Sequence, residues 1–312
     1  MNHQPHHRSR LQRLFTSAYT LCAAGLLLAG ALRVQAAAPG PRSATEGQEV
    51  FLGGNFLELG INRLGSFGTS VAKPAGFLGT TNYPSIGMST DPDGYGVGTD
   101  QRFDFFFPGT PYVAWFAGYK LGGVPTTGVN NTDERTGTMP TTVADLSSGT
   151  NLMARSTATL GGNLQIVQTV SFSVDQRFYK VVVGLTNIGA AAIDNVRYVF
   201  EVNPDNTVDI GGNYATRNVI LNTFQAGDPR AVVEAQSVAR DAVQTKLPLV
   251  STDNRARVSF GGILSPDQLG VYAPRYYDSA RAKGDSEESN NTVSIACDVG
   301  TLAPGQGSTF TY

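Results

Sequence analysis

The chain is poor in the residues that most often carry acid–base and metal chemistry in enzymes. It contains three histidines, His3, His6 and His7, and two cysteines, Cys22 and Cys297. All of these except Cys297 fall within the first 36 residues. If that segment is removed, the remainder has no Ser-His-Asp or Cys-His catalysis and no histidine-bound zinc. A single remaining cysteine also excludes a disulfide within the mature chain.

The first 36 residues have the pattern of a signal peptide. Three arginines, at positions 8, 10 and 13, precede an apolar run over residues 14–32. The small-residue sequence at 34–36 follows, as at a cleavage site. This pattern predicts a secreted, periplasmic or cell-surface protein whose mature chain begins near Ala37. Contact with a membrane is expected only through an uncleaved signal, because a run of this length also spans a bilayer.

The mature chain has no excess of basic residues. Without the four arginines of the signal, 19 basic residues stand against 25 acidic ones, a formal net charge of −6. Nucleic-acid binding is therefore not expected, because phosphate neutralisation needs clustered lysine and arginine. The 36 glycines indicate many turns between strands.

Strand periodicity is strongest in three consecutive runs, at 164–172, 179–185 and 196–202. In each run apolar side chains alternate with polar ones, which is typical of a half-buried strand. Three such strands with short connections predict one antiparallel sheet. We therefore predict an all-β fold, a large antiparallel β-sandwich over residues 50–312, preceded by a disordered lead at 37–49.

Other segments give weaker patterns. Residues 101–119 predict an aromatic hairpin, and residues 120–151 predict a long surface loop with one weak strand. Residues 231–243 fit a strand and a helix equally well, and residues 278–291 predict an exposed loop. Further strands are expected at 255–263, 292–299 and 308–312.

Part of the second half resembles exported bacterial β-sandwich proteins, many of unassigned function. The resemblance rests on Phe-Tyr-Lys-Val-Val-Val-Gly-Leu-Thr-Asn at 178–187, Asn-Pro-Asp-Asn at 203–206 and the Gly-rich tail at 300–310. It implies a large sandwich of the kind that carbohydrate-active proteins also use. The pattern usually has aspartate where this chain has Asn203, and the stop at Tyr312 suggests that a final strand is missing.

Closely spaced carboxylates make residues 91–100 a candidate calcium site. Asp91, Asp93 and Asp100 supply the hard oxygen ligands that calcium prefers, although the spacing is not that of an EF-hand. The sequence Asp-Pro-Asp-Gly is equally a favoured turn, because proline presets φ and glycine accepts a positive φ.

A second group of oxygen ligands follows the predicted strand at 196–202. It contains Asp205 and Asp209, together with Asn203 and Asn206, and it too is interpreted either as calcium ligands or as a plain turn.

Two catalytic hypotheses use residues of the second half. Glu201, Asp205 and Asp209 are candidates for the paired carboxyl groups of a glycosidase, although the strand pattern predicts that Glu201 faces solvent. The cluster at 275–278, Arg-Tyr-Tyr-Asp, is a candidate for Tyr/Arg lyase chemistry or a set of polar loop residues.

Aromatic residues near the predicted hairpin offer a binding alternative. Their rings either stack on sugars or pack in the core, and the residues are Tyr112, Trp115, Phe116 and Tyr119. Cys297 alternates with apolar residues and is expected to be a buried, inert thiol.

These observations favour a non-catalytic exported or surface protein that binds an extracellular glycan or protein, with structural calcium as a further expectation. The alternative is a carbohydrate-active hydrolase or lyase that uses carboxylates or Tyr/Arg.

Overall fold

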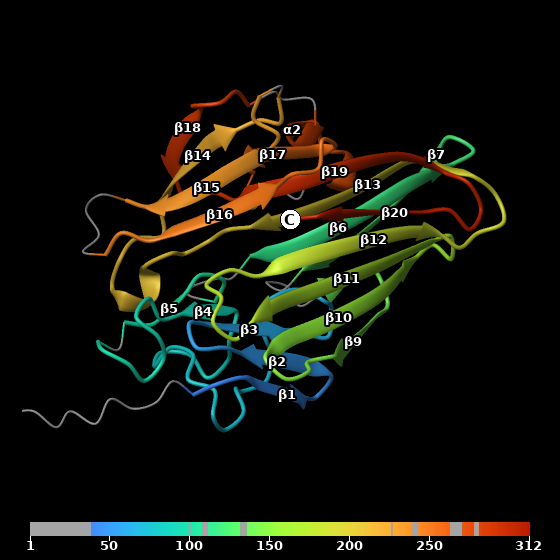
Figure 1. Ribbon diagram of the computed structural model, residues 1–312. Helices are drawn as coiled ribbons and strands as arrows, with labels where there is room; N and C mark the ends of the chain where they lie inside the picture. The colour runs from blue at the N-terminus through green and yellow to red at the C-terminus, as the bar shows by residue number, and fades with distance from the viewer. Residues whose placement is uncertain are drawn as a thin grey trace, which may run out of the picture. The chain divides into compact units, whose positions relative to one another are not determined.

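The computed structural model describes residues 39–99, 101–107, 112–131, 136–225, 227–238, 243–262, 270–277 and 281–312. The predicted signal peptide lies outside these residues. Within them the chain forms four antiparallel β-sheets and a few single helical turns (Figure 1), which confirms the all-β, antiparallel prediction. None of the described helices is long and apolar enough to cross a membrane.

Sheet 1 is built from strands that follow one another in the sequence. Each strand pairs with the next in antiparallel register. The two strands β2 and β3 are buried along their whole length, so both faces of the sheet are covered. The strands are β1 (Arg42–Glu46), β2 (Glu49–Gly53), β3 (Leu57–Ile61), β4 (Met88–Thr90) and β5 (Phe103–Asp104).

Sheet 2 contains the longest regular pairing of the molecule. Side chains along β11 alternate strictly between buried and half-buried positions, as the period-2 pattern of the sequence predicts. In spatial order the strands are β20 (Gly307–Thr311), β12 (Lys180–Asn187), β11 (Leu164–Ser173), β10 (Asn151–Leu160) and β9 (Thr141–Asp145).

Sheet 3 brings together strands from distant parts of the chain. Its centre is formed by β19, β13 and β6, whose side chains are mostly buried. In spatial order the strands are β17 (Ala256–Phe260), β19 (Val293–Leu302), β13 (Ile193–Val202), β6 (Val113–Leu121), β7 (Val124–Asn131) and β8 (Thr136–Gly137).

Sheet 4 is the smallest and ends at strand β16. Its spatial order is β16 (Lys246–Ser251), β15 (Ala231–Ser237), β14 (Thr216–Asn222) and β18 (Ser286–Ser289). The strand β15 settles the ambiguity over residues 231–243 in favour of a strand for Ala231–Ser237. The helical turns are η1 (Val208–Ile210), η2 (Gly270–Tyr272) and α2 (Pro274–Tyr277).

Side chains of sheets 2 and 3 meet in one hydrophobic core. The ring of Tyr198 on β13 lies 5.3 Å from the ring of Phe310 on β20, and its hydroxyl donates to Gln168 Oε1 on β11 at 2.6 Å. A buried tyrosine hydroxyl and a buried amide therefore satisfy each other inside the core.

A β-bulge determines which side chains of β13 face the core. The register shifts between Ile193 and Arg197, and Asn195 takes a positive φ of 49°. A bulge adds one residue and re-phases the strand, which places Tyr198 and Phe200 in the shared core.

The prediction that β11, β12 and β13 form one sheet is wrong for the third strand. β13 pairs with β19 and β6 of sheet 3. The buried Asn187 amide donates to the carbonyl oxygens of Ala191 and Leu302, both at 2.8 Å, and so holds the connection where the chain leaves sheet 2. The bond to Leu302 ties the end of β12 to β19, the strand with which β13 pairs.

The predicted aromatic hairpin over 101–119 is also wrong. β5 pairs with β4 in sheet 1, whereas β6 pairs in sheet 3. The Asp104 carboxylate accepts the backbone N–H groups of Gly87, Met88 and Phe106, and these bonds hold β5 against sheet 1. The predicted turn at 108–111 lies outside the described residues.

The long surface loop predicted over 120–151 is largely strand. Gly122 and Gly123 both take positive φ, as a two-residue hairpin turn requires, and they join β6 to β7. β9 and the start of β10 follow in the same stretch. The sequence gives no alternation here because β7 has threonine, proline and asparagine on a partly exposed face.

Two further segments predicted as irregular contain strands. Arg42–Glu46 forms β1, so the prediction of disorder over 37–49 is wrong for these residues. Ser286–Ser289 forms β18 within the loop predicted at 278–291, although its side chains are mostly exposed as expected. Residues 278–280 lie outside the described residues.

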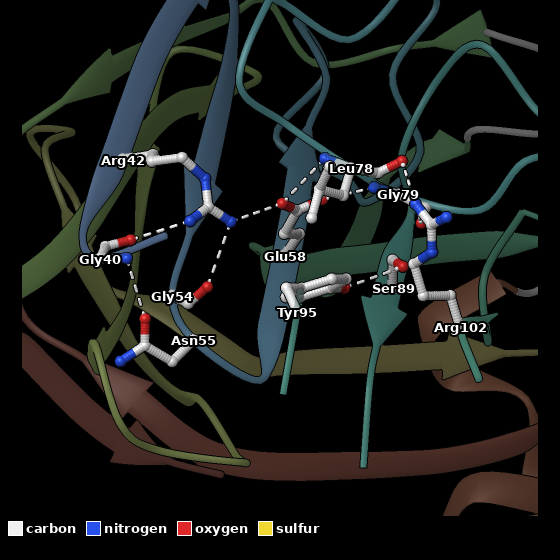
Figure 2. A network of polar contacts seen from close by, with 10 residues as sticks. All are labelled: Gly40, Arg42, Gly54, Asn55, Glu58, Leu78, Gly79, Ser89, Tyr95 and Arg102. Atoms are coloured by element: carbon white, nitrogen blue, oxygen red, sulfur yellow. Dashed lines mark hydrogen bonds and ion pairs between the residues drawn. The ribbon is translucent and has the colours of Figure 1, made fainter. Parts of the chain in front are cut away.

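A buried carboxylate organises sheet 1 and the loop above it. Glu58 on β3 is fully buried and pairs with Arg42 on β1, with Nη2 2.6 Å from Oε1. Its oxygens also accept the backbone N–H groups of Leu78 and Gly79, at 3.0 and 2.6 Å (Figure 2). Arg102 donates to the carbonyl oxygens of the same two residues. The irregular chain at Leu78 and Gly79 therefore forms hydrogen bonds through both its N–H groups and its carbonyl groups.

We expect the substitution Glu58→Gln to destabilise the protein strongly. Removing one partner of a buried ion pair leaves the other charge uncompensated, and such changes lower the free energy of unfolding by about 3–5 kcal/mol. Urea denaturation monitored by tryptophan fluorescence measures the loss. The matched control is Glu46→Gln on exposed β1, for which the change should stay within about 0.5 kcal/mol. Equal effects of the two substitutions would contradict the role of Glu58.

Candidate functional site

The described residues form a groove of about 600 Å³. Residues 246–252, which include all of β16, line it together with residues 177–180, which lead into β12. The other walls come from the end of β20 and from the β4 region around Asp91. The groove thus lies where sheets 1, 2 and 4 approach one another.

The groove has an apolar floor and a basic rim. Leu247 and Leu249 on β16 line the floor, and Phe178, 64% exposed, lies at the mouth. Three basic side chains contribute to the wall, Arg177, Lys180 and Lys246, and all three residues are exposed.

Two of the basic side chains are held in place by neighbours. The Arg177 guanidinium lies over the ring of Phe56, 4.4 Å from its centroid. Lys246 Nζ lies 3.3 Å from a carboxylate oxygen of Glu234. Both contacts leave the side chains near solvent, so each contributes little to stability and keeps its charge available to a ligand.

The strand β16 borders the groove as an edge strand. It is the outermost strand of sheet 4, and its side chains alternate between exposed and buried. Pro248 in its middle is a residue that sheets tolerate only at an edge. An edge strand within a groove offers backbone hydrogen-bonding groups to an extended ligand.

The predicted calcium site at 91–100 contains a tight turn. Gly94 N donates to the Asp91 carbonyl at 3.2 Å, and Gly94 has a φ of 103°, which confirms the turn interpretation of Asp-Pro-Asp-Gly. A hydrogen bond with the Asp91 carboxyl, and then one from Thr99 N, hold the pKa of Asp93 below its usual range. Asp100 lies outside the described residues.

Asp205 and Asp209 are both buried after the end of β13. One carboxylate oxygen of each, and the amide oxygens of Asn203 and Asn206, have no hydrogen-bond donor among the described residues. Burial raises the pKa of Asp205 to about 8 and that of Asp209 to about 7.

Three of the four side chains at 203–209 make hydrogen bonds to different parts of the fold. No group of three or more His, Cys, Asp or Glu residues that suits a metal ion occurs among the described residues. Asp209 instead contacts sheet 1, since its Oδ2 accepts Asp104 N at 3.0 Å. Asn206 Nδ2 donates to the Ala235 carbonyl on β15 at 3.0 Å.

The structure brings Glu201 into contact with Arg275 and Tyr276, two sets of catalytic candidates that lie far apart in the sequence. Glu201 is fully buried, so the prediction that it faces solvent is wrong. Its carboxylate accepts the hydroxyl hydrogens of Tyr276 and of Thr292, the latter at 2.5 Å, and lies 3.3 Å from Arg275 Nη2. The alternation of β13 breaks here because α2 covers what is otherwise an outer face.

The electrostatics of the cluster of Glu201, Arg275 and Tyr276 indicate a structural role. Burial raises the pKa of Tyr276 far above its usual value, and the negative Glu201 raises it further. A tyrosine that acts as a general base needs the opposite shift. Tyr277 is separate, since its hydroxyl donates to the Tyr198 carbonyl and the Arg197 guanidinium lies 4.1 Å from its ring centroid. Asp278 lies outside the described residues.

The four predicted stacking aromatics do not share a surface. Trp115 and Tyr119 are each 1% exposed and pack in the main core, whereas Phe116 packs on the opposite face of β6 with Tyr276. Tyr112, which is half-buried, packs beside Phe116. A buried ring has no free face for a sugar, so of the four only Tyr112 retains an accessible part.

Cys297 is buried on β19, as the sequence predicts. Burial raises the pKa of its thiol to about 12, so the reactive thiolate is scarce at neutral pH.

Sequence reasoning missed the groove. Its residues are far apart in the chain and meet only through the packing of three sheets. The available signal was the run Arg-Phe-Tyr-Lys at 177–180, in which two exposed basic residues flank two aromatics.

Comparisons with known proteins give no assignment. No protein-family model matches the chain, and no curated protein has a significantly similar sequence. The resemblance to exported bacterial β-sandwich proteins therefore stays a prediction.

We expect stability to depend on the ionisation of Asp205. Its pKa in the folded chain, about 8, is above the value of about 3.8 of an unfolded aspartate, so it favours folding most below pH 3.8 and loses this effect as the pH rises to 8. Because each pKa unit corresponds to about 1.4 kcal/mol, the free energy of unfolding should rise by at least about 2 kcal/mol from pH 8 to pH 5.

Urea denaturation across this pH range measures the effect, with Asp205→Asn as the test variant. The substitution keeps the shape and removes the charge, so the rise should shrink. The matched control is Asp228→Asn, whose carboxylate is held ionised by Arg230 and shows the opposite pKa shift. An unchanged pH profile in Asp205→Asn would contradict the prediction.

Proposed function

We propose that the chain is an exported, non-catalytic protein that binds an extracellular partner in the groove along β16. The observation that supports this proposal is the combination of an apolar floor with three basic side chains at the rim. Such a groove suits a ligand that carries both apolar groups and negative charge.

An extended segment of a partner protein fits this chemistry better than a glycan. The lining is mainly aliphatic and aromatic, and it offers one carboxylate, that of the buried Asp91. Glycan recognition relies mainly on side-chain hydrogen bonds, whereas most of the surface of this groove is apolar. A peptide strand instead places backbone groups beside the edge of β16 and alternate side chains on the groove floor.

A carbohydrate-active hydrolase or lyase is the alternative, and it has less support. Glu201, Arg275 and Tyr276 satisfy one another in a buried cluster, and the pKa of Tyr276 is raised. Degradation of a polysaccharide by the full chain, abolished by Glu201→Gln, would favour the enzyme.

We further propose that sheets 2 and 3 constitute the predicted β-sandwich, with sheets 1 and 4 added at its ends. The contact of Tyr198 with Phe310 and Gln168 supports this arrangement, and the main core that sheets 2 and 3 share extends into sheets 1 and 4.

The groove predicts charge-selective binding of an extended peptide. A fluorescently labelled octapeptide of alternating valine and glutamate serves as the probe, and fluorescence anisotropy measures its Kd with the full chain. The double substitution Lys180→Glu and Lys246→Glu should weaken binding by at least about tenfold, because it replaces attraction by repulsion at the rim. Added salt should weaken binding to the wild type.

The matched control is the double substitution Arg217→Glu and Lys283→Glu, which changes the net charge equally on exposed residues away from the groove. It should leave the Kd unchanged. Equal binding of a valine–lysine octapeptide, or no binding of either peptide, would contradict a protein segment as the ligand. Binding of oligogalacturonate alone, sensitive to the groove substitutions, would replace it with an acidic glycan.

Structural calcium at Asp91, Asp93 and Asp100 is part of the same proposal. A cation that binds only the folded chain raises the melting temperature with its concentration. We therefore expect calcium to raise the Tm relative to EDTA, and Asp93→Asn to remove the difference. Differential scanning calorimetry measures both values, and an identical Tm with calcium and with EDTA would reject the site.

A further inference from the structure

A second cavity, separate from the groove, lies where the loop of sheet 1 meets the turn η1. It encloses about 270 Å³ and shares no lining residue with the groove. Its lining is mainly polar, with side chains of both donor and acceptor type: Thr80, Thr81, Asn82, Gln101, Arg102 and Asp209. The space is far larger than the share of one water molecule, roughly 30 Å³ in the liquid.

Two buried oxygen atoms on the cavity wall have no partner. Thr80 is 3% exposed and Asp209 is 8% exposed. Among the described residues no donor or acceptor satisfies Thr80 Oγ1, and no donor reaches Asp209 Oδ1. Buried polar atoms without partners are costly, and where they face a cavity they mark a place for a ligand or ordered water.

Hydrogen bonds hold other atoms of Thr80 and Asp209 in place. Lys73 Nζ donates to the Thr80 carbonyl at 2.8 Å, and the preceding residue, Gly79, is bonded to Glu58 (Figure 2). Asp209 Oδ2 accepts Asp104 N at 3.0 Å. The two unpartnered oxygens are therefore fixed in place, which lowers the entropy that a ligand loses on binding.

We propose that this cavity binds a single neutral sugar unit through two neighbouring hydroxyl groups. One hydroxyl donates to Asp209 Oδ1, and the next exchanges a hydrogen bond with Thr80 Oγ1. Exposed side chains of Thr81, Asn82 and Gln101 surround the cavity, and Ile210, 44% exposed, offers an apolar contact to the ring.

The polar lining argues against charged ligands. A metal cation would lie near the Arg102 guanidinium and would find a single carboxylate, that of Asp209. An anion would lie against Asp209. A hydroxyl group suits both walls because it donates and accepts hydrogen bonds.

Thr80→Val and Asp209→Asn test the proposal in the full chain. The probes are D-glucose, D-galactose, D-mannose and L-fucose, measured by saturation-transfer difference NMR and isothermal titration calorimetry. At least one sugar should bind with a millimolar Kd, and each substitution should weaken its binding by about tenfold, as expected for the loss of one hydrogen bond.

Thr309→Val, an exposed threonine on β20, is the matched control and should leave the Kd unchanged, as should the groove variant with Lys180→Glu and Lys246→Glu. Melting temperatures separate loss of binding from loss of folding; if Asp209→Asn does not fold, Thr80→Val alone decides. Absence of binding by all four sugars, or binding that both substitutions leave intact, would overturn the proposal. Calcium binding that Asp209→Asn abolishes would overturn it in favour of a metal site.

Discussion

The irregular segment between β3 and β4 depends on buried glutamates for its hydrogen bonds. Glu58 bonds the chain at Leu78 and Gly79, and Glu49 accepts Ser70 N and Oγ, both at 2.7 Å. The described residues form no strand between β3 and β4 to do the same. Buried backbone groups must be paired, so these carboxylates replace a strand partner. The position of Thr80, and with it the polar cavity, follows from this constraint.

Buried acids of this protein fall into two groups with different roles. Glu58, Glu201 and Asp104 each accept several hydrogen bonds, which tie neighbouring segments together, while burial raises the pKa of Glu201 and of Asp104. Asp205 and Asp209 are buried with oxygens left unpaired, and their pKa values are raised. The acids of the first group hold neighbouring segments of the fold together. The second reduces stability at neutral pH, and such residues concentrate where a protein binds something.

The sequence predicted elements well where packing follows local alternation. β11 and β12 carry their burial pattern in their own residues. The sequence did not predict burial or contacts that depend on a residue far away in the chain. Glu201 has the alternation of a solvent-facing residue, yet α2 covers it, and 72 or more intervening residues hide that contact from any local pattern. The sequence did not indicate the groove or the cavity for the same reason, because each is made by segments far apart in the chain.

The two edge strands beside the groove are not equivalent. On β20 the carbonyl oxygens of Thr309 and Thr311 accept Arg255 Nη2 and Ser251 Oγ, both at 2.6 Å. Side chains therefore occupy the acceptors on which another strand would pair, which is one way that proteins protect an edge. β16 is broken only by Pro248, which removes a single donor and leaves the other backbone groups of the strand. Because the Ser251 contact also fixes β16 beside β20, the groove keeps its width, and β16 is the edge on which an extended ligand can add a strand.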